Sequence, residues 1–189
     1  MNERMKRIRR WGLLGAAAVG LTTVSAALGI SSGVYDVGAT DGHTRPVEWA
    51  LRSTMEASVR EHAADVTIPD GVDTRDPALA ARAIGHYSAA CASCHGAPGR
   101  ARAPWMVLYP EPANLTDAAT VDRWSDAELY WIIKHGIKDT GMIALGPTHQ
   151  EKDLWAVTAF VRQLPSMTED EYARQVAELQ ARRGGGMKP

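Results

Sequence analysis

The sequence contains only two cysteines among its 189 residues, which excludes a framework of several disulfides. It also excludes a zinc site built from four cysteines, because a structural zinc ion takes four protein ligands. There is one phenylalanine against six tryptophans. We find no internal repeat and no alternation of apolar and polar residues that would predict a β-strand. These absences favour an all-α protein with one small domain and appendages.

Negative charge exceeds positive charge after the first ten residues. Residues 1–10 carry a net charge of +4 while the whole chain carries −1, so residues 11–189 carry −5. A mildly acidic domain lacks the basic surface with which proteins bind nucleic acid. We therefore expect no nucleic-acid partner.

One long uncharged stretch, Gly12–Val34, follows the basic residues. A helix of that length, at ~1.5 Å per residue, spans roughly 34 Å, enough for the ~30 Å hydrocarbon core of a bilayer. Residues 11–34 are therefore predicted to be a transmembrane anchor, with the basic flank in the cytoplasm and the rest outside. A cleaved signal peptide is the alternative, because Val24-Ser25-Ala26 resembles a small-residue cleavage site. Both interpretations export the remainder of the chain.

Both cysteines fall in one motif, Cys91-Ala92-Ser93-Cys94-His95. Two thiols at this spacing add to the two vinyl groups of one haem, and the adjacent imidazole binds the iron as the proximal ligand. A disulfide inside the motif would close a very short, strained loop. A thioredoxin-like redox pair would need a βαβ setting, for which no strand pattern exists. The motif therefore predicts one covalent haem c, in the periplasm of a bacterium, where such haems are attached.

The segment after the motif, residues 96–110, is rich in glycine and proline and is predicted to be a loop. Its proline carbonyls are suited to orient the proximal imidazole. We expect the carbonyl of Pro104 to accept the Nδ1 proton of His95, which leaves Nε2 for the iron.

The distal iron ligand is expected on the glycine-flanked loop Lys138–Gly146, where the thioether of Met142 can reach over the haem. A core position is the alternative for Met142, because most methionines are core residues. Met106 and His135 are rival ligands, although His135 also suits the end of a helix, where a cation complements the dipole. Two further candidates come from the segment before the motif: His43 and His62.

Helix start signals divide the remaining chain. Pro46 suits the first turn of a helix that ends near Ala64 and rests on the haem domain, the membrane or a partner subunit. Asp76 and Pro77 are predicted to begin a helix that leads into Cys91. Three further helices are predicted: capping boxes begin two of them, at Ser125 and Thr148, and Thr168–Glu171 opens the third. The predicted parts are a cytoplasmic basic flank (1–10), a transmembrane anchor (11–34), a periplasmic linker and helical arm (35–75), a haem domain (76–165), and a C-terminal helix with a mobile tail (166–189).

The order of these motifs resembles the class I cytochromes c of the bacterial monohaem kind, over about half of the chain. The resemblance is carried by the CxxCH motif and by four later segments: Pro112–Leu115, Trp124–Gly136, Thr140–Met142 and Leu154–Val161. It implies an all-α class I cytochrome c fold in which the first and last core helices cross over a buried haem. It also implies that Cys91 and Cys94 form the thioethers, that His95 is the proximal ligand and that Met142 is the distal ligand. Two departures are Ala83, where many members have glycine, and Ile143, where many have proline.

A haem with both axial positions filled has no site for a substrate. The expected function is therefore one-electron transfer at the inner membrane, in exchange with redox protein partners, and not catalysis. A subunit of a larger membrane-bound or periplasmic oxidoreductase is the first alternative. It would co-purify with a partner protein in stoichiometric amount. A haem sensor or peroxidase is the second, and it would show rapid carbon monoxide binding or peroxide turnover.

Overall fold

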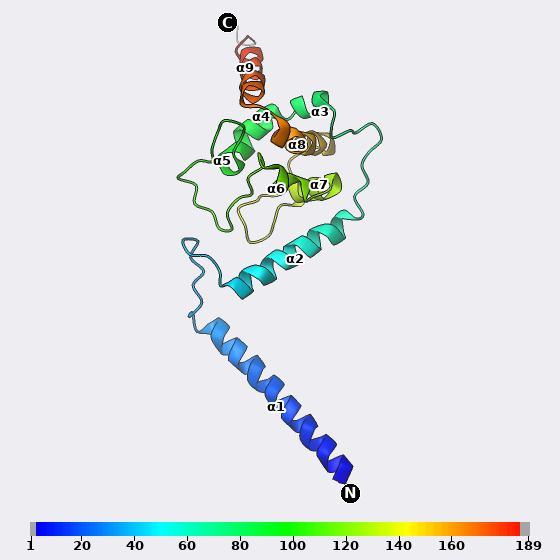
Figure 1. The fold of residues 1–189 in the computed structure, drawn as a ribbon, viewed down its shortest axis with the longest axis vertical. Coiled ribbons are helices and arrows are strands. Elements are labelled where there is room, and N and C mark those ends of the chain that lie inside the picture. Colours follow the sequence, from blue (N-terminus) through cyan, green and yellow to red (C-terminus); the bar gives the residue numbers. More distant parts are fainter. Residues whose placement is uncertain (1–2, 186–189) are drawn as a thin grey trace. The chain divides into compact units, whose positions relative to one another are not determined.

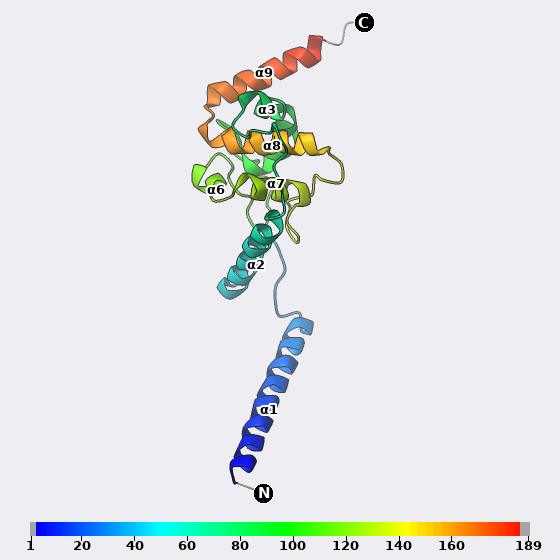
Figure 2. The ribbon, with the colours of Figure 1, turned by 90° about the vertical axis from the view of Figure 1, so that its right-hand side faces the viewer.

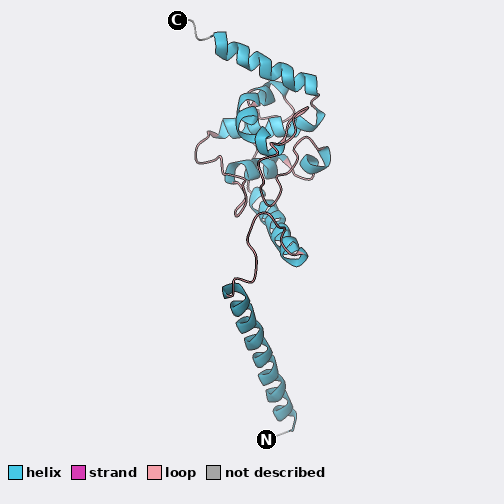
Figure 3. Cartoon of the chain, turned by 90° about the vertical axis from the view of Figure 1, so that its left-hand side faces the viewer, coloured by secondary structure: helices cyan, strands magenta, loops and turns pink. Residues whose placement is uncertain are grey.

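Helices are the regular elements of this protein in the computed structural model, which describes residues 3–185 (Figure 3). Within these residues no strand forms, and a lone bridge joins Ala97 to Arg100. The predicted all-α class is confirmed. The helices are α1 (Glu3–Ser31), α2 (Arg45–Ala63), α3 (Pro77–Ala81), α4 (Ile84–His86), the π-helical turn η1 (Tyr87–Cys91), α5 (Ala92–His95), α6 (Ala118–Asp122), α7 (Asp126–His135), α8 (Glu151–Gln163), the 3-10 turn η2 (Leu164–Ser166) and α9 (Glu169–Gly185).

The chain divides into two units, residues 1–41 and residues 42–189. The first contains α1, a helix of 29 residues with none buried. It is long and apolar enough to cross a membrane, and its length and position suit a signal sequence equally. The predicted apolar N-terminal helix is thus present.

The second unit is organised around α8. This helix lies between α3 and α7, and α2 packs on α7 (Figures 1 and 2). Its side chains form much of the core: Trp155 is 1% exposed and stacks on Tyr130 at 4.1 Å between ring centroids, and Phe160 is fully buried against Tyr87 at 4.9 Å. Such aromatic pairs add to the stability gained from burial alone. Ala83, one of the two departures from the family pattern, is also buried here.

Helix α9 extends this core at the C-terminal side. It packs against α4, and the buried Tyr172 exchanges a 2.9 Å hydrogen bond with the hydroxyl of Ser88. The helix includes Gly184 and Gly185, which belong to the part of the chain predicted as a C-terminal helix and mobile tail. Residues 186–189, at the end of the predicted mobile tail, lie outside the described residues.

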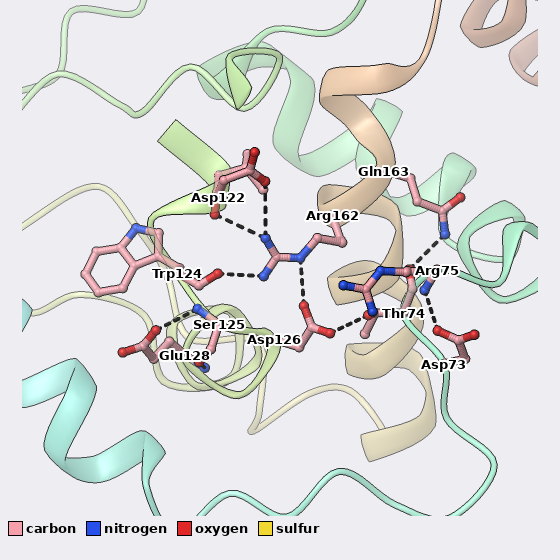
Figure 4. A network of polar contacts seen from close by, with 11 residues as sticks. Asp73, Thr74, Arg75, Asp122, Trp124, Ser125, Asp126, Glu128, Arg162 and Gln163 are labelled. Carbon is pink, nitrogen blue, oxygen red and sulfur yellow. Dashed lines mark hydrogen bonds and ion pairs between the residues drawn. The ribbon is translucent and has the colours of Figure 1, made fainter. Parts of the chain in front are cut away.

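A polar network around Arg162 joins the segment before α3 to α6, α7 and α8 (Figure 4). The Arg162 guanidinium donates to Asp126 at 2.7 Å, and to the carbonyls of Trp124 and Val121 at 2.6 and 3.3 Å. The other carboxylate oxygen of Asp126 accepts from the buried Thr74 hydroxyl. This network fixes the segment before α3 onto α7 and α8.

Capping boxes are present at two of these three predicted helix starts. At Ser125, the side chain accepts from the backbone N–H of Glu128, whose carboxylate accepts from the Ser125 N–H. Thr168 and Glu171 make the same pair of bonds. The box predicted at Thr148 is wrong, because its hydroxyl donates to the carbonyl of Leu145 and the helix begins three residues later.

The predicted helix from Asp76 into Cys91 is interrupted. The Asp76 side chain does cap α3, accepting from the N–H of Ala78 at 2.8 Å. After α3 the Ala83 N–H donates to the carbonyl of Ala80, three residues earlier, as in a 3-10 turn. The chain then forms the wider π-helical turn η1 before the motif. Such π-turns are rare and frequently occur at functional sites.

Candidate haem site

The two cysteines lie on consecutive turns, Cys91 at the end of η1 and Cys94 in α5. Both side chains are half-buried, and no disulfide joins them. Burial raises the pKa of Cys91 to about 11, with a smaller contribution from Cys94. The spacing of the two cysteines on consecutive turns fits the attachment of a haem by two thioethers.

His95 has a defined tautomer. Its Nδ1 lies 2.8 Å from the carbonyl oxygen of Ala113, which can only accept a hydrogen bond. Nδ1 therefore carries the proton and Nε2 keeps its lone pair for a metal. Burial also lowers the pKa of His95, against the opposing effect of this hydrogen bond, and favours the neutral ring. The prediction that Pro104 is the acceptor is wrong. Ala113 belongs to the segment Pro112–Leu115, which supported the family resemblance but was not assigned as the acceptor for His95.

The turn that carries the motif is held by backbone contacts and one buried tyrosine. The Tyr87 hydroxyl donates to the carbonyl of Gly96 at 2.6 Å, and this ring is fully buried. Burial raises the pKa of Tyr87 far above its usual value, so it remains a donor. The Leu115 N–H donates to the His95 carbonyl at 3.3 Å. These bonds fix the C-terminal end of the motif, and the tyrosine is a structural residue that sequence reasoning did not single out.

Met142 lies on a loop with its own internal hydrogen bonds. The Ile137 N–H donates to the Met142 carbonyl at 3.1 Å. The Thr140 hydroxyl donates to the Ile137 carbonyl at 2.7 Å and accepts from the Met142 N–H at 3.1 Å. The loop thus holds the half-buried Met142 at a fixed distance from the end of α7.

The other predicted ligands lie elsewhere or make other contacts. Met106 places its sulfur 2.8 Å from Cys94 Sγ. His135 is the last residue of α7, as expected, but burial and the nearby Lys134 lower its pKa and disfavour a cation. His62 is hydrogen-bonded to the Ser58 carbonyl on its own helix. His43 packs edge-on against Tyr109.

Gly136 controls where the Met142 loop begins. Its φ of +67° is combined with an extended ψ, a conformation essentially limited to glycine, and a Cβ there would lie 2.5 Å from the Met142 carbonyl oxygen. We predict that Gly136→Ala displaces the loop and costs about 1–3 kcal/mol of unfolding free energy. The measurement is chemical unfolding of the holoprotein, with its visible spectrum recorded in parallel.

Gly71→Ala is the matched control for this prediction. Gly71 has a φ of +80°, but a Cβ there would meet nothing within 4 Å. It therefore also places an alanine at a positive φ, but without a clash near Met142. Equal spectral changes in the two variants would contradict a role of Gly136 in placing Met142.

A cavity of about 1300 Å³ adjoins the site. One wall contains Gly96 and Ala113, the latter being the hydrogen-bond acceptor for His95. Another contains Ile137 and Thr140, from the loop that carries Met142. The cavity therefore touches segments beside both of the predicted iron ligands.

Comparison with known proteins finds a family match for the segment that contains the predicted haem ligands. Residues 78–161 match the family model described as "Cytochrome C oxidase, cbb3-type, subunit III". No curated protein and no solved structure matches the chain significantly. Residues 78–161 form a cytochrome c domain, whose cofactor is a covalently attached haem c. This match agrees with the haem c electron carrier that the motif predicted.

Proposed function

We propose that this protein is a one-electron carrier with a single haem c, bound through Cys91 and Cys94 and ligated by His95 and Met142. We further propose that α1 is an uncleaved anchor in the inner membrane of a bacterium and that the haem domain faces the periplasm. The haem iron supplies the one-electron chemistry when bound. The chain's residues hold the cofactor, fill both axial positions and limit the access of water.

The hydrogen bond from His95 Nδ1 to the Ala113 carbonyl is the observation that carries this proposal. A histidine that uses Nδ1 as a donor presents Nε2 as a ligand, and the acceptor increases its basicity. Because the acceptor is a backbone carbonyl in an ordered segment, the ring orientation is fixed before the iron binds. A fixed ligand favours electron transfer, since the ligation changes little between the two oxidation states.

Met142 is the better candidate for the distal ligand than Met106. The sulfur of Met106 lies beside Cys94 Sγ, and that cysteine bonds to a vinyl group at the edge of the macrocycle. A sulfur at the ring edge is poorly placed for the axial position above the iron. The Met142 loop, in contrast, is ordered by three internal hydrogen bonds and begins at a helix packed on the core. Thioether ligation favours ferrous iron and a raised potential.

Absorption spectra of the oxidised and reduced holoprotein test this assignment. We predict that the wild type and Met106→Ala are low-spin and show the weak far-red band of sulfur–iron ligation. We predict that Met142→Ala loses this band and binds carbon monoxide when reduced, because one axial position is open. If the band is absent in the wild type or survives Met142→Ala, Met142 is not the ligand, and a sensor or peroxidase becomes the better interpretation.

A subunit of a larger oxidoreductase is the second candidate, and exposed apolar side chains favour it. Trp105 and Val107 are 75% and 69% exposed on the loop after the motif, and Ile143, beside Met142, is 69% exposed. The two loops adjoin, because Gly141 lies against the side chain of Leu108. Extraction in a mild detergent decides between the candidates: a partner recovered in stoichiometric amount supports the subunit, and recovery of the chain alone supports the free carrier.

A further inference from the structure

One arginine, Arg102, lies beside the predicted proximal ligand. The backbone next to it is bonded to the haem-attachment motif, because the Ala103 N–H donates to the Ser93 carbonyl at 3.0 Å. Its side chain lies against the residue that follows His95, since a Cβ on Gly96 would be 4.0 Å from Cγ of Arg102. Both the backbone and the side chain therefore hold this arginine close to His95.

The guanidinium of Arg102 reaches the segment that accepts the hydrogen bond of His95. Its Nη1 donates to the carbonyl of Pro112 at 3.5 Å, and the next carbonyl, that of Ala113, accepts from His95 Nδ1 at 2.8 Å. Burial and, to a smaller extent, the Arg102 charge lower the pKa of His95, against the hydrogen bond to Ala113. The charge of Arg102 thus acts on the imidazole from the side of Nδ1.

Glu111 forms an ion pair with the same guanidinium but neutralises it incompletely. The side chain of Glu111 is 72% exposed, whereas that of Arg102 is 38% exposed. Because water and salt screen the more exposed charge more strongly, the two charges do not cancel at His95. A net positive potential therefore remains beside the predicted proximal ligand.

We propose that Arg102 raises the reduction potential of the haem iron through its charge, and that Glu111 moderates this effect. This inference rests on the proposed function, in which His95 binds the iron. Ferric haem carries one more positive charge than ferrous haem, so a nearby guanidinium disfavours the oxidised form. Arg102 does not bind the iron and acts on it through space.

The test is a redox titration of the full-length holoprotein in detergent, with the variants Arg102→Gln and Glu111→Gln. Both remove one charge, and both break the same ion pair. We expect Arg102→Gln to lower the ratio of reduced to oxidised protein about two- to threefold at a fixed potential, which is ~18–28 mV for a one-electron couple. Glu111→Gln is expected to raise this ratio by a smaller factor. Both changes are expected to shrink at high salt.

The opposite signs separate an effect of charge from an effect of structure. If the ion pair served only to hold the segment around Ala113, breaking it from either side would shift the potential in the same direction. The visible spectrum would then change in both variants, because the orientation of His95 would change. Arg102→Lys keeps the positive charge, so its potential is expected to lie closer to that of the wild type than the potential of Arg102→Gln does.

Arg82→Gln is the matched control. Arg82 follows α3 and lies 4.0 Å from Asp153 of α8, in a pair that is also partly exposed. We expect this variant to change the potential less than Arg102→Gln. Equal changes in these two arginine variants, or changes of the same sign in Arg102→Gln and Glu111→Gln, would overturn the inference. Failure of the proposed function is distinguishable, because the wild type would then lack covalent haem or His/Met ligation.

Discussion

Replacement of both Cys91 and Cys94 by serine is expected to abolish covalent haem attachment completely. A serine hydroxyl does not add to a haem vinyl group to form a thioether, and these are the two cysteines of the chain. The thiols lie on consecutive turns of η1 and α5, so each single variant is expected to retain one thioether and a reduced yield of holoprotein. Haem staining after denaturing electrophoresis and the intact protein mass measure the outcome.

Ser93→Ala is the control for the cysteine variants. Ser93 stands between the two cysteines, and its backbone carbonyl, which the substitution keeps, accepts from the Ala103 N–H at 3.0 Å. The variant is therefore expected to carry a normal amount of haem. A haem mass that survives denaturation in the double serine variant would contradict the assignment of both thioethers.

Replacement of Arg162 by leucine is expected to destabilise the protein by about 3–5 kcal/mol, the usual cost of removing one partner from a buried ion pair. The Arg162 side chain is 15% exposed and that of its partner Asp126 is 21% exposed. The substitution leaves this carboxylate without its charge partner, and the carbonyls of Val121 and Trp124 lose a donor. Denaturant unfolding of the holoprotein measures the loss.

Two variants separate this effect from the loss of a charge in general. Arg82 lies 4.0 Å from Asp153, and the side chains are 53% and 48% exposed. Because exposed pairs contribute about 0–1 kcal/mol, Arg82→Leu is expected to have little effect. Arg162→Lys keeps the charge but not the planar set of donors, so an intermediate loss is expected. If Arg82→Leu and Arg162→Leu are equally destabilising, the network in Figure 4 does not stabilise the fold as described.

Local signals in the sequence predicted the helices well, because they depend on residues that are close together in the chain. The boxes at Ser125 and Thr168 need only a partner three residues away, and both are present. The box at Thr148 has the same spacing but fails, since the preceding loop offers the Leu145 carbonyl to its hydroxyl. The short helix α6 was not predicted, although Asp117 caps it, because its five residues give no helical periodicity.

The haem site was predictable in its covalent chemistry but not in its surroundings. The CxxCH motif fixes the cofactor through spacing alone, and the family match agrees. The acceptor for His95 lies 18 residues away on an irregular segment, and Arg162 reaches partners 36 to 41 residues away. Such contacts depend on how the helices pack, which the pattern of single residues does not encode. The position of α2 could not be predicted for the same reason. Its sequence pattern was compatible with packing on the haem domain, on the membrane or on a partner subunit.

The attachment of α2 shortens the free connection between the proposed anchor and the redox domain. The predicted linker and arm, residues 35–75, would reach roughly 140 Å if fully extended. In the structure, α1 ends at Ser31 and the second unit begins at Gly42. The residues between them extend at most roughly 35 Å. If the proposed anchor is retained, a tether of this length keeps the domain in a layer close to the bilayer, and its electron donors and acceptors would have to operate within that layer.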